Sequence, residues 1–163
     1  MNESNYKVLL VILLIVLGAM FGVFSLYAHT IMPGLRHVDD PVFVKSFKAI
    51  DTAIINPVFM LQFFLPIGLF AVALFYASKK HTSSMPLLLV GLGCYLLGFL
   101  LTIIINVPLN DGIKRVSNTA SGNELTLARV AFHESRWVIS NFVRTATTLA
   151  SAICAAIVLA TSI

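Results

Sequence analysis

Long uncharged apolar runs, separated by short charged stretches, dominate the sequence. Four of them cover residues 8–28, 52–78, 82–110 and 145–163, and even the shortest has 19 residues. About 20 residues carry an α-helix across the hydrocarbon core of a bilayer. We therefore predict an all-α integral membrane four-helix bundle, folded as a single transmembrane domain over residues 1–163. The expected spans are about 8–28, 54–78, 85–107 and 134–162.

The first run has the position of a signal peptide but lacks its other features. It is longer than a usual signal-peptide core, and only Lys7 supplies basic charge ahead of it. No small-x-small cleavage site clearly precedes the polar stretch that follows. We expect a retained transmembrane helix.

The connections between the runs are unequal in length, which sets the topology. Lys79-Lys80-His81 forms a tight turn between the second and third runs. About 23 residues from His29 join the first two spans, and residues 111 to about 129 join the last two. With four spans, both long connections lie on one side of the membrane, called here the loop side. The termini and the tight turn lie on the other side, the terminal side.

Two further helices are expected on the loop side. Asp40-Pro41, with proline at a first helical position, predicts a short amphipathic helix over residues 42–51. Phe43 and Phe47 lie on its apolar face, and we expect this helix to rest on the bilayer surface. After a polar turn, Glu124 opens a helix that is expected to run unbroken into the fourth span.

The charges leave the orientation in the membrane open. Eight Lys or Arg residues lie on the loop side and three on the terminal side, so the positive-inside rule favours cytoplasmic loops. Three of the eight lie on the fourth helix, where they can serve a site instead. Without them the count is five to three, which decides little.

Composition narrows the class of protein. Apolar residues make up 58% of the chain and charged residues 11%, against about 45–50% and about 25% in soluble domains. This composition excludes intrinsic disorder, and it has too few charged residues to cover the surface of a soluble enzyme. No stripe of basic residues suggests that the protein binds nucleic acid. Cys94 and Cys154 lie in apolar runs and are expected to be packing residues. We expect a multi-pass protein of the bacterial inner membrane or an equivalent, with the lipid bilayer as partner and a homo-oligomer possible in principle.

Polar residues of different spans are expected at one depth. At 1.5 Å of rise per residue, His29, Asn106 and Arg144 each lie about 28–33 Å along their helices from the terminal side. Asn56 opens the second span from the loop side. All four spans therefore bring a polar residue to the loop-side end of the bundle, which random scatter would not produce.

Within the helices these polar residues share faces with other polar or small residues. Spacing by three or four predicts one stripe on the fourth helix and one on the third. Gly18 and Gly22 form a Gly-x-x-x-Gly pair on the first helix, where small residues allow close helix approach. The stripe on the fourth helix comprises His133, Trp137, Asn141, Arg144, Thr148 and Ser151, and that on the third comprises Gly91, Gly98, Thr102, Asn106 and Asn110.

Each of these residues taken alone also has an ordinary interpretation. Arg144 is compatible with an arginine that snorkels to the interface, and Trp137 with an interfacial aromatic belt. His29 is compatible with an interfacial polar residue, and Asn106 and Asn110 with caps at a helix end. Together they favour a pocket, because buried ionisable and amide groups in a membrane bundle are costly and usually functional.

Two motifs resemble a known family. The sequence N-V-P-L-N at residues 106–110, followed by W-x-x-x-N-x-x-R at 137–144, is similar to the anthrone oxygenase family of small four-helix membrane proteins. That family was long catalogued as a domain of unknown function. The resemblance implies oxidation of anthrones to anthraquinones with molecular oxygen in aromatic polyketide pathways. Matched by position, it implies a site of Asn106, Asn110, Trp137, Asn141 and Arg144.

The chemistry that fits needs a base, a partner for an oxyanion and a flat apolar slot. Removal of a proton from the anthrone methylene gives an enolate that can pass an electron to oxygen, so no cofactor or metal is predicted. His133 is the favoured base and His29 the alternative. Arg144, with Asn141 or Asn106, would hold the enolate oxygen, and Trp137 would stack on the rings. The hypothesis assigns catalysis to His133, Arg144 and Asn141, and substrate binding to Asn106, Asn110, Trp137 and His29.

Two alternatives stay open from the sequence. One is a haem or metal protein of the membrane, in which His29 and His133 face each other at one depth. The other is a non-catalytic membrane protein that binds an apolar small molecule or lipid, or acts as an accessory subunit.

Overall fold

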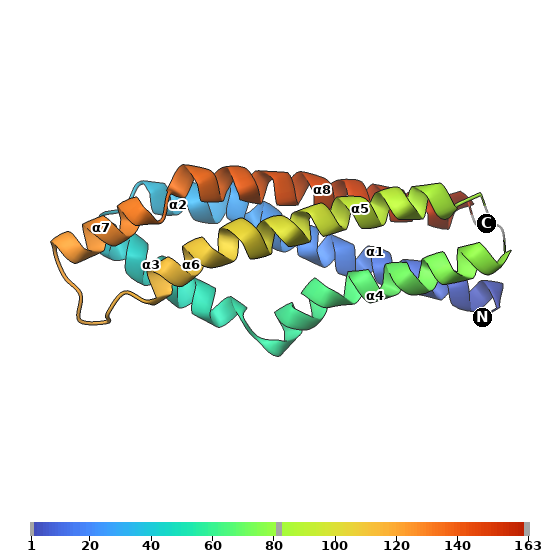
Figure 1. Ribbon diagram of the computed structural model, residues 1–163, viewed down its shortest axis with the longest axis horizontal. Helices are drawn as coiled ribbons and strands as arrows, with labels where there is room; N and C mark the ends of the chain where they lie inside the picture. Colours follow the sequence, from blue (N-terminus) through green and yellow to red (C-terminus); the bar gives the residue numbers. More distant parts are fainter. Residues whose placement is uncertain (1, 81–82, 162–163) are drawn as a thin grey trace.

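The structure is a computed structural model that describes residues 2–80 and 83–161, and it is built of helices (Figure 1). Within those two ranges no β-strand is present, so the predicted all-α class is confirmed. Two of the helices are interrupted by π-helical turns, named here the first π turn (Tyr27–Ile31) and the second π turn (Thr102–Asn106). The α-helices are α1 (Glu3–Leu26), α2 (Met32–Arg36), α3 (Asp40–Ile54), α4 (Pro57–Lys80), α5 (Met85–Leu101), α6 (Val107–Lys114), α7 (Asn123–Ala131) and α8 (Glu134–Thr161).

Four continuous helices are long and apolar enough to cross a membrane: Glu3–Arg36, Pro57–Lys80, Met85–Lys114 and Glu134–Thr161. They close into a ring in which α1 and α5 each contact α8 and α4. The start of α1, the end of α4, the start of α5 and the end of α8 lie together at one end of the molecule, while α2, α3, α6 and α7 gather at the other (Figure 1). The integral membrane four-helix bundle is thereby confirmed. The turn residue His81 and the expected end of the fourth span at residue 162 lie outside the described residues.

Among the described glycines, only Gly91 and Gly98 on α5 lie directly against neighbouring helices. A Cβ at Gly98 would lie 3.0 Å from Thr147 Oγ1 and 3.6 Å from Arg144 Cα. The expectation of close approach at Gly18 and Gly22 is wrong, because both are exposed and nothing lies within 4 Å of where their Cβ atoms would stand. The α5–α8 contact, rather than an α1 contact, thus depends on small residues.

Both π turns occur just before a proline. The first ends two residues before Pro33 and the second two residues before Pro108. Proline lacks an amide hydrogen and crowds the preceding turn, and a π turn is one way for a helix to accommodate the disturbance. The spans predicted from the sequence end at about residue 28 for the first helix and about residue 107 for the third. Both helices instead continue, to Arg36 and Lys114.

Helix α3 does not use its apolar face in the way that its amphipathic pattern suggested. Phe43, Val44 and Phe47 are buried against protein, and Phe43 and Phe47 contact the ring of Phe132. The expectation that this face rests on the bilayer surface is therefore wrong. Amphipathicity shows that a face must be covered, and here α6 and α7 cover it.

The helix expected to run unbroken from Glu124 into the fourth span is broken at His133. This residue has a φ of +49°, and its carbonyl accepts hydrogen bonds from the amides of Arg136 and Trp137 at the start of α8. A positive φ is uncommon for a residue other than glycine. The turn between α7 and α8 therefore points the His133 side chain away from the stripe that its spacing predicted.

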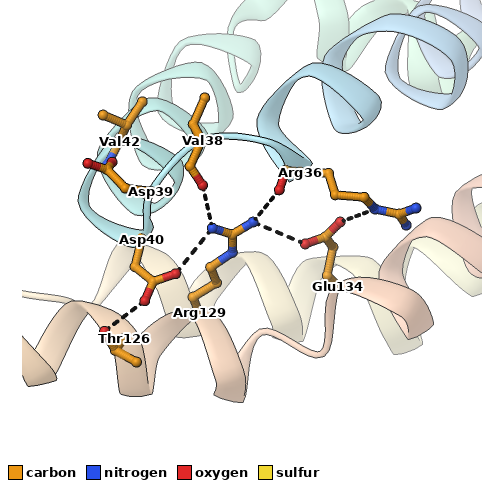
Figure 2. A network of polar contacts seen from close by, with 8 residues as sticks. All are labelled: Arg36, Val38, Asp39, Asp40, Val42, Thr126, Arg129 and Glu134. Carbon is orange, nitrogen blue, oxygen red and sulfur yellow. Dashed lines mark hydrogen bonds and ion pairs between the residues drawn. The ribbon is translucent and has the colours of Figure 1, made fainter.

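A polar network holds this corner in place (Figure 2). Arg129 of α7 donates through Nη1 to the Val38 carbonyl at 2.7 Å and to Asp40 Oδ1 at 3.1 Å. Through Nη2 it donates to the Arg36 carbonyl at 3.0 Å and lies 3.6 Å from Glu134 Oε2. Arg36 Nε pairs with the other oxygen of Glu134 at 3.0 Å. One guanidinium thus ties the α2–α3 connection to both α7 and α8.

Candidate functional site

A cavity of about 90 Å³ lies at the loop-side end of the bundle. Both π turns contribute to its wall or flank it, and such turns are frequent at functional sites. Its lining is mostly apolar and aromatic, with five polar or charged side chains besides the tyrosine. The lining residues are Val23, Phe24, Tyr27, Asp51, Ile54, Ile55, Phe59, Thr102, Val107, Asn110, Lys114, Trp137 and Arg144.

Arg144 on α8 is the buried cation of this cavity, with 5% of its surface exposed. Its Nη1 donates to Thr102 Oγ1 at 3.2 Å and its Nη2 to Asn141 Oδ1 at 2.7 Å, whereas Nε has no hydrogen-bond partner. The guanidinium also stands over the rings of Phe24, at 4.5 Å, and Trp137, at 5.4 Å. Among the described residues no carboxylate forms an ion pair with it. The snorkelling interpretation does not fit a side chain buried this way.

Asn141 holds Arg144 rather than lining the cavity itself. It is fully buried, and its Nδ2 donates to the carbonyl of Phe24 at 3.0 Å, so α8 is tied to α1 just before the first π turn. Its Oδ1 is the acceptor of the Arg144 hydrogen bond. Both ends of the amide are therefore used within the protein, and they fix the direction of the guanidinium.

Asn106 likewise joins helices and does not line the cavity. Its Oδ1 accepts from Ser140 Oγ at 2.7 Å, and its Nδ2 donates to the Trp137 carbonyl at 3.3 Å.

Asn110, one turn on, does line the cavity. Its Oδ1 accepts from the indole Nε1 of Trp137 at 2.6 Å, and its Nδ2 donates to Asp51 Oδ1 at 2.6 Å. Neither asparagine caps a helix end, because the helix continues through both.

Three polar residues of the cavity wall were missed by the reasoning from sequence: Tyr27, Asp51 and Lys114. Asp51 is 5% exposed, and its Oδ2 lies 3.2 Å from Lys114 Nζ. Lys114 also lies 2.8 Å from Asp111 Oδ1. The spacing of Asn110 and Lys114 by four residues was a usable signal, but only if the helix was known to continue past Pro108.

The two histidines do not line the cavity. His29 is exposed on the first π turn, where its Nδ1 lies 2.6 Å from Thr30 Oγ1, and His133 is exposed in the α7–α8 turn. The expectation that the His133 imidazole points into the pocket is wrong, because the backbone turns at that residue. In the described part of the chain no group of three or more His, Cys, Asp or Glu side chains is placed to hold a metal ion. Neither of the two histidines is therefore placed to bind a haem or a metal ion inside this cavity.

These features define an integral membrane four-helix protein with a charged pocket at the loop-side end of its bundle. The sequence profile of the anthrone oxygenase family matches residues 58–154, which is more than half of the chain, and the protein belongs to that family. No curated protein and no solved structure matches the chain significantly. The matched segment includes Asn110, Trp137 and Arg144, whereas Tyr27 and Asp51 lie outside it.

Proposed function

We propose that the cavity binds an apolar aromatic ketone of the anthrone type and promotes its oxidation by molecular oxygen to the quinone. The observation that carries this proposal is the buried Arg144, which has neutral partners only and a free Nε. A buried cation without an ion pair is costly in a low-dielectric site, and the carboxylate of Asp51 on the same cavity wall offsets that cost only from a distance. An enolate oxygen would offset that cost and would be stabilised by the cation as charge develops on it.

The reaction is balanced without a cofactor. A base takes one proton from the methylene group, and the resulting enolate transfers an electron to oxygen. Recombination of the two radicals gives a peroxide at the former methylene carbon. The first proton returns to the peroxide, the remaining hydrogen of that carbon leaves as a proton, and the O–O bond breaks, so that water is lost and the new carbonyl forms. One anthrone and one O₂ thus give one anthraquinone and one H₂O. The protein supplies position and charge, while oxygen is the oxidant.

The walls of the cavity suit a flat apolar substrate. Trp137 and Tyr27 lie with ring centroids 5.6 Å apart, and Phe24 lies under the guanidinium. A volume of about 90 Å³ is below the roughly 300 Å³ at which ligand pockets begin. Binding therefore requires movement of the rim, where Ile55 and Val107 are exposed apolar residues. Such a rim suits access from the hydrocarbon of a bacterial inner membrane or an equivalent membrane.

The test uses the single tryptophan of the chain. Because Trp137 lines the cavity, quenching of its fluorescence by anthrone measures binding, and an oxygen electrode measures turnover above the spontaneous rate. We expect Arg144→Met to lower kcat/KM for anthrone by about 100-fold or more, the loss typical of an oxyanion donor. Arg136→Met, which changes an exposed arginine on the same helix, is the matched control and should leave kcat/KM unchanged.

The second reading, a non-catalytic binder, is an outcome of the same experiment. Quenching of Trp137 by anthrone without any oxygen uptake would support that reading and contradict the oxygenase proposal. Equal activity in Arg144→Met and in the parent protein would remove Arg144 from the mechanism.

A further inference from the structure

We propose that Asp51 is the base of the cavity, taking the methylene proton from the substrate and returning it to the peroxide oxygen that leaves as water. This inference rests on the proposed function, which it deepens by assigning the proton transfer. It concerns a residue of α3 outside the segment that matches the family.

The position of Asp51 carries the argument. Among the residues that line the cavity it is the one carboxylate, and only 5% of its surface is exposed. The hydrogen bond from Asn110 Nδ2 fixes Oδ1, and Asn110 is itself fixed by the indole of Trp137. A buried acid held in one orientation on a cavity wall is a candidate for proton transfer.

The arrangement of charges fits an enolisation. Arg144 stands over the Trp137 ring. The indole nitrogen of Trp137 is linked to Asp51 by the two hydrogen bonds of Asn110. The cavity therefore has a cation on one part of its wall and an acceptor of protons on another. In an anthrone the carbonyl oxygen and the acidic methylene lie at opposite ends of the central ring, so one substrate can meet both groups.

The other titratable groups of the wall are less suited to this step. Lys114 contacts two carboxylates, of Asp51 and Asp111, and an ammonium between two anions has no free electron pair. Arg144 is a cation, and the phenol of Tyr27 is a donor rather than a base when protonated. His29 and His133 lie outside the cavity wall. Asp51 remains as the proton acceptor.

Lys114 also gives Asp51 a connection to water. Its ammonium lies between the buried Asp51 and Asp111, whose side chain is 40% exposed. When Lys114 gives one of its protons to Asp111, it can accept the proton of Asp51, so Asp51 exchanges protons with the aqueous phase on the loop side while the substrate stays in the apolar cavity. In the oxidation itself the proton returns to the peroxide, so no net proton is released.

The test separates proton transfer from oxidation by excluding oxygen. Protein in nanodiscs is incubated anaerobically with anthrone in D₂O, and mass spectrometry follows deuterium at the methylene carbon. We expect the parent protein to exceed the protein-free rate and Asp51→Asn to lose about 100-fold of that excess, the effect typical of a general base. Asp51→Glu should restore part of it. Glu124→Gln, at an exposed acid of α7, is the control and should exchange like the parent.

Binding of anthrone, measured by Trp137 quenching, shows that each variant retains its fold. If Asp51→Asn fails to fold because Lys114 is left with Asp111 as its one partner, the double variant with Lys114→Met removes the charges of both residues 51 and 114. That double variant is judged by the same criterion. Undiminished exchange in a variant that binds anthrone would overturn the assignment of Asp51 and leave the oxidation proposal intact. Exchange that depends on Asp51 without oxygen uptake in air would support the assignment and contradict the oxidation. A parent protein that catalyses neither process overturns both.

Discussion

Asn106 and Arg144 are both buried polar residues at one depth of the bundle, but their hydrogen-bonding groups are used differently. The amide of Asn106 has a partner at each end, Ser140 and the Trp137 carbonyl. Arg144 has neutral partners, retains a free Nε and faces the cavity. The first pattern belongs to a residue that joins helices, whereas the second leaves a hydrogen-bond donor for the substrate that we propose.

This contrast predicts that Asn106 contributes to stability and not to binding. Asn106→Ala removes two interhelical hydrogen bonds between the third and fourth spans, and we expect a loss of about 1 kcal/mol in the free energy of unfolding. The Kd for anthrone, measured by Trp137 quenching, should stay within about twofold, because Asn106 does not line the cavity. Asn123→Ala, at the exposed start of α7, is the control for stability. Weakened binding at unchanged Tm would return Asn106 to the binding site.

At the residue scale, the sequence predicts how deep each polar side chain lies along its helix, but it predicts only in part which way that side chain points. Counting from the terminal side located Asn106 and Arg144, because rise per residue is nearly constant in a helix. The direction of the His133 side chain was predicted wrongly because the periodicity argument assumes an unbroken helix. The backbone at His133 has a φ of +49°, which breaks the helix there. Asp51 was missed because its partners, Asn110 and Lys114, are more than 50 residues away in the chain.

At the scale of elements, two helices share one local design. Each has a π turn, then one residue, then proline, at the level of the cavity: residues 27–33 on the first span and 102–108 on the third. A π turn holds one residue more per turn than an α-helix would, so it rotates everything that follows by about 100°. The second π turn thus sets which residues of α6 face α3. The sequence favoured an end to each helix because proline commonly marks one.

Pro108 can be tested for this role. Pro108→Ala restores an amide hydrogen, and we expect the second π turn to relax toward a regular α-helix, which turns Asn110 and Lys114 away from Asp51. Helix content by circular dichroism should be unchanged, while the emission maximum of Trp137 shifts because its hydrogen bond to Asn110 is lost. Pro86→Ala, at the first turn of α5, is the matched control and should leave the emission unchanged. An unshifted spectrum in Pro108→Ala would show that the π turn persists without proline.

At the scale of the whole molecule, helices α2, α3 and α7 form a cap over the loop-side end of the bundle, and the cap forms part of the cavity. Asp40 is one of the residues that join α3 to α7 within the cap. The hydrogen bond from Thr126, together with the hydrogen bond and charge of Arg129, holds the pKa of Asp40 below its usual range. The sequence predicted α3 but not its place in the cap, since amphipathicity does not distinguish a lipid surface from protein.

The cap should therefore loosen in acid. A carboxylate with a lowered pKa stabilises the folded state above its unfolded pKa of about 4, and that contribution is lost as the pH falls through the lower folded value. We expect the difference in Tm between the parent and Asp40→Asn to shrink as the pH is lowered from about 5 to about 3. Thr126→Val, which removes the first of the two partners, should show a smaller difference of the same kind. A constant difference across this range would contradict the role of the Asp40 carboxylate.

For the oxidation that we propose, the exposed apolar rim at Ile55 and Val107 determines which concentration of the substrate sets the rate. An apolar aromatic ketone partitions into hydrocarbon, and so does oxygen, because burial of apolar surface away from water is favourable. A cavity that fills from the bilayer then responds to the mole fraction of substrate in the membrane and not to its concentration in water. Adding empty lipid at constant total substrate would dilute the substrate in two dimensions and slow the reaction, as in the surface-dilution kinetics of interfacial enzymes. A water-filled route through the cap would leave the rate tied to the aqueous concentration.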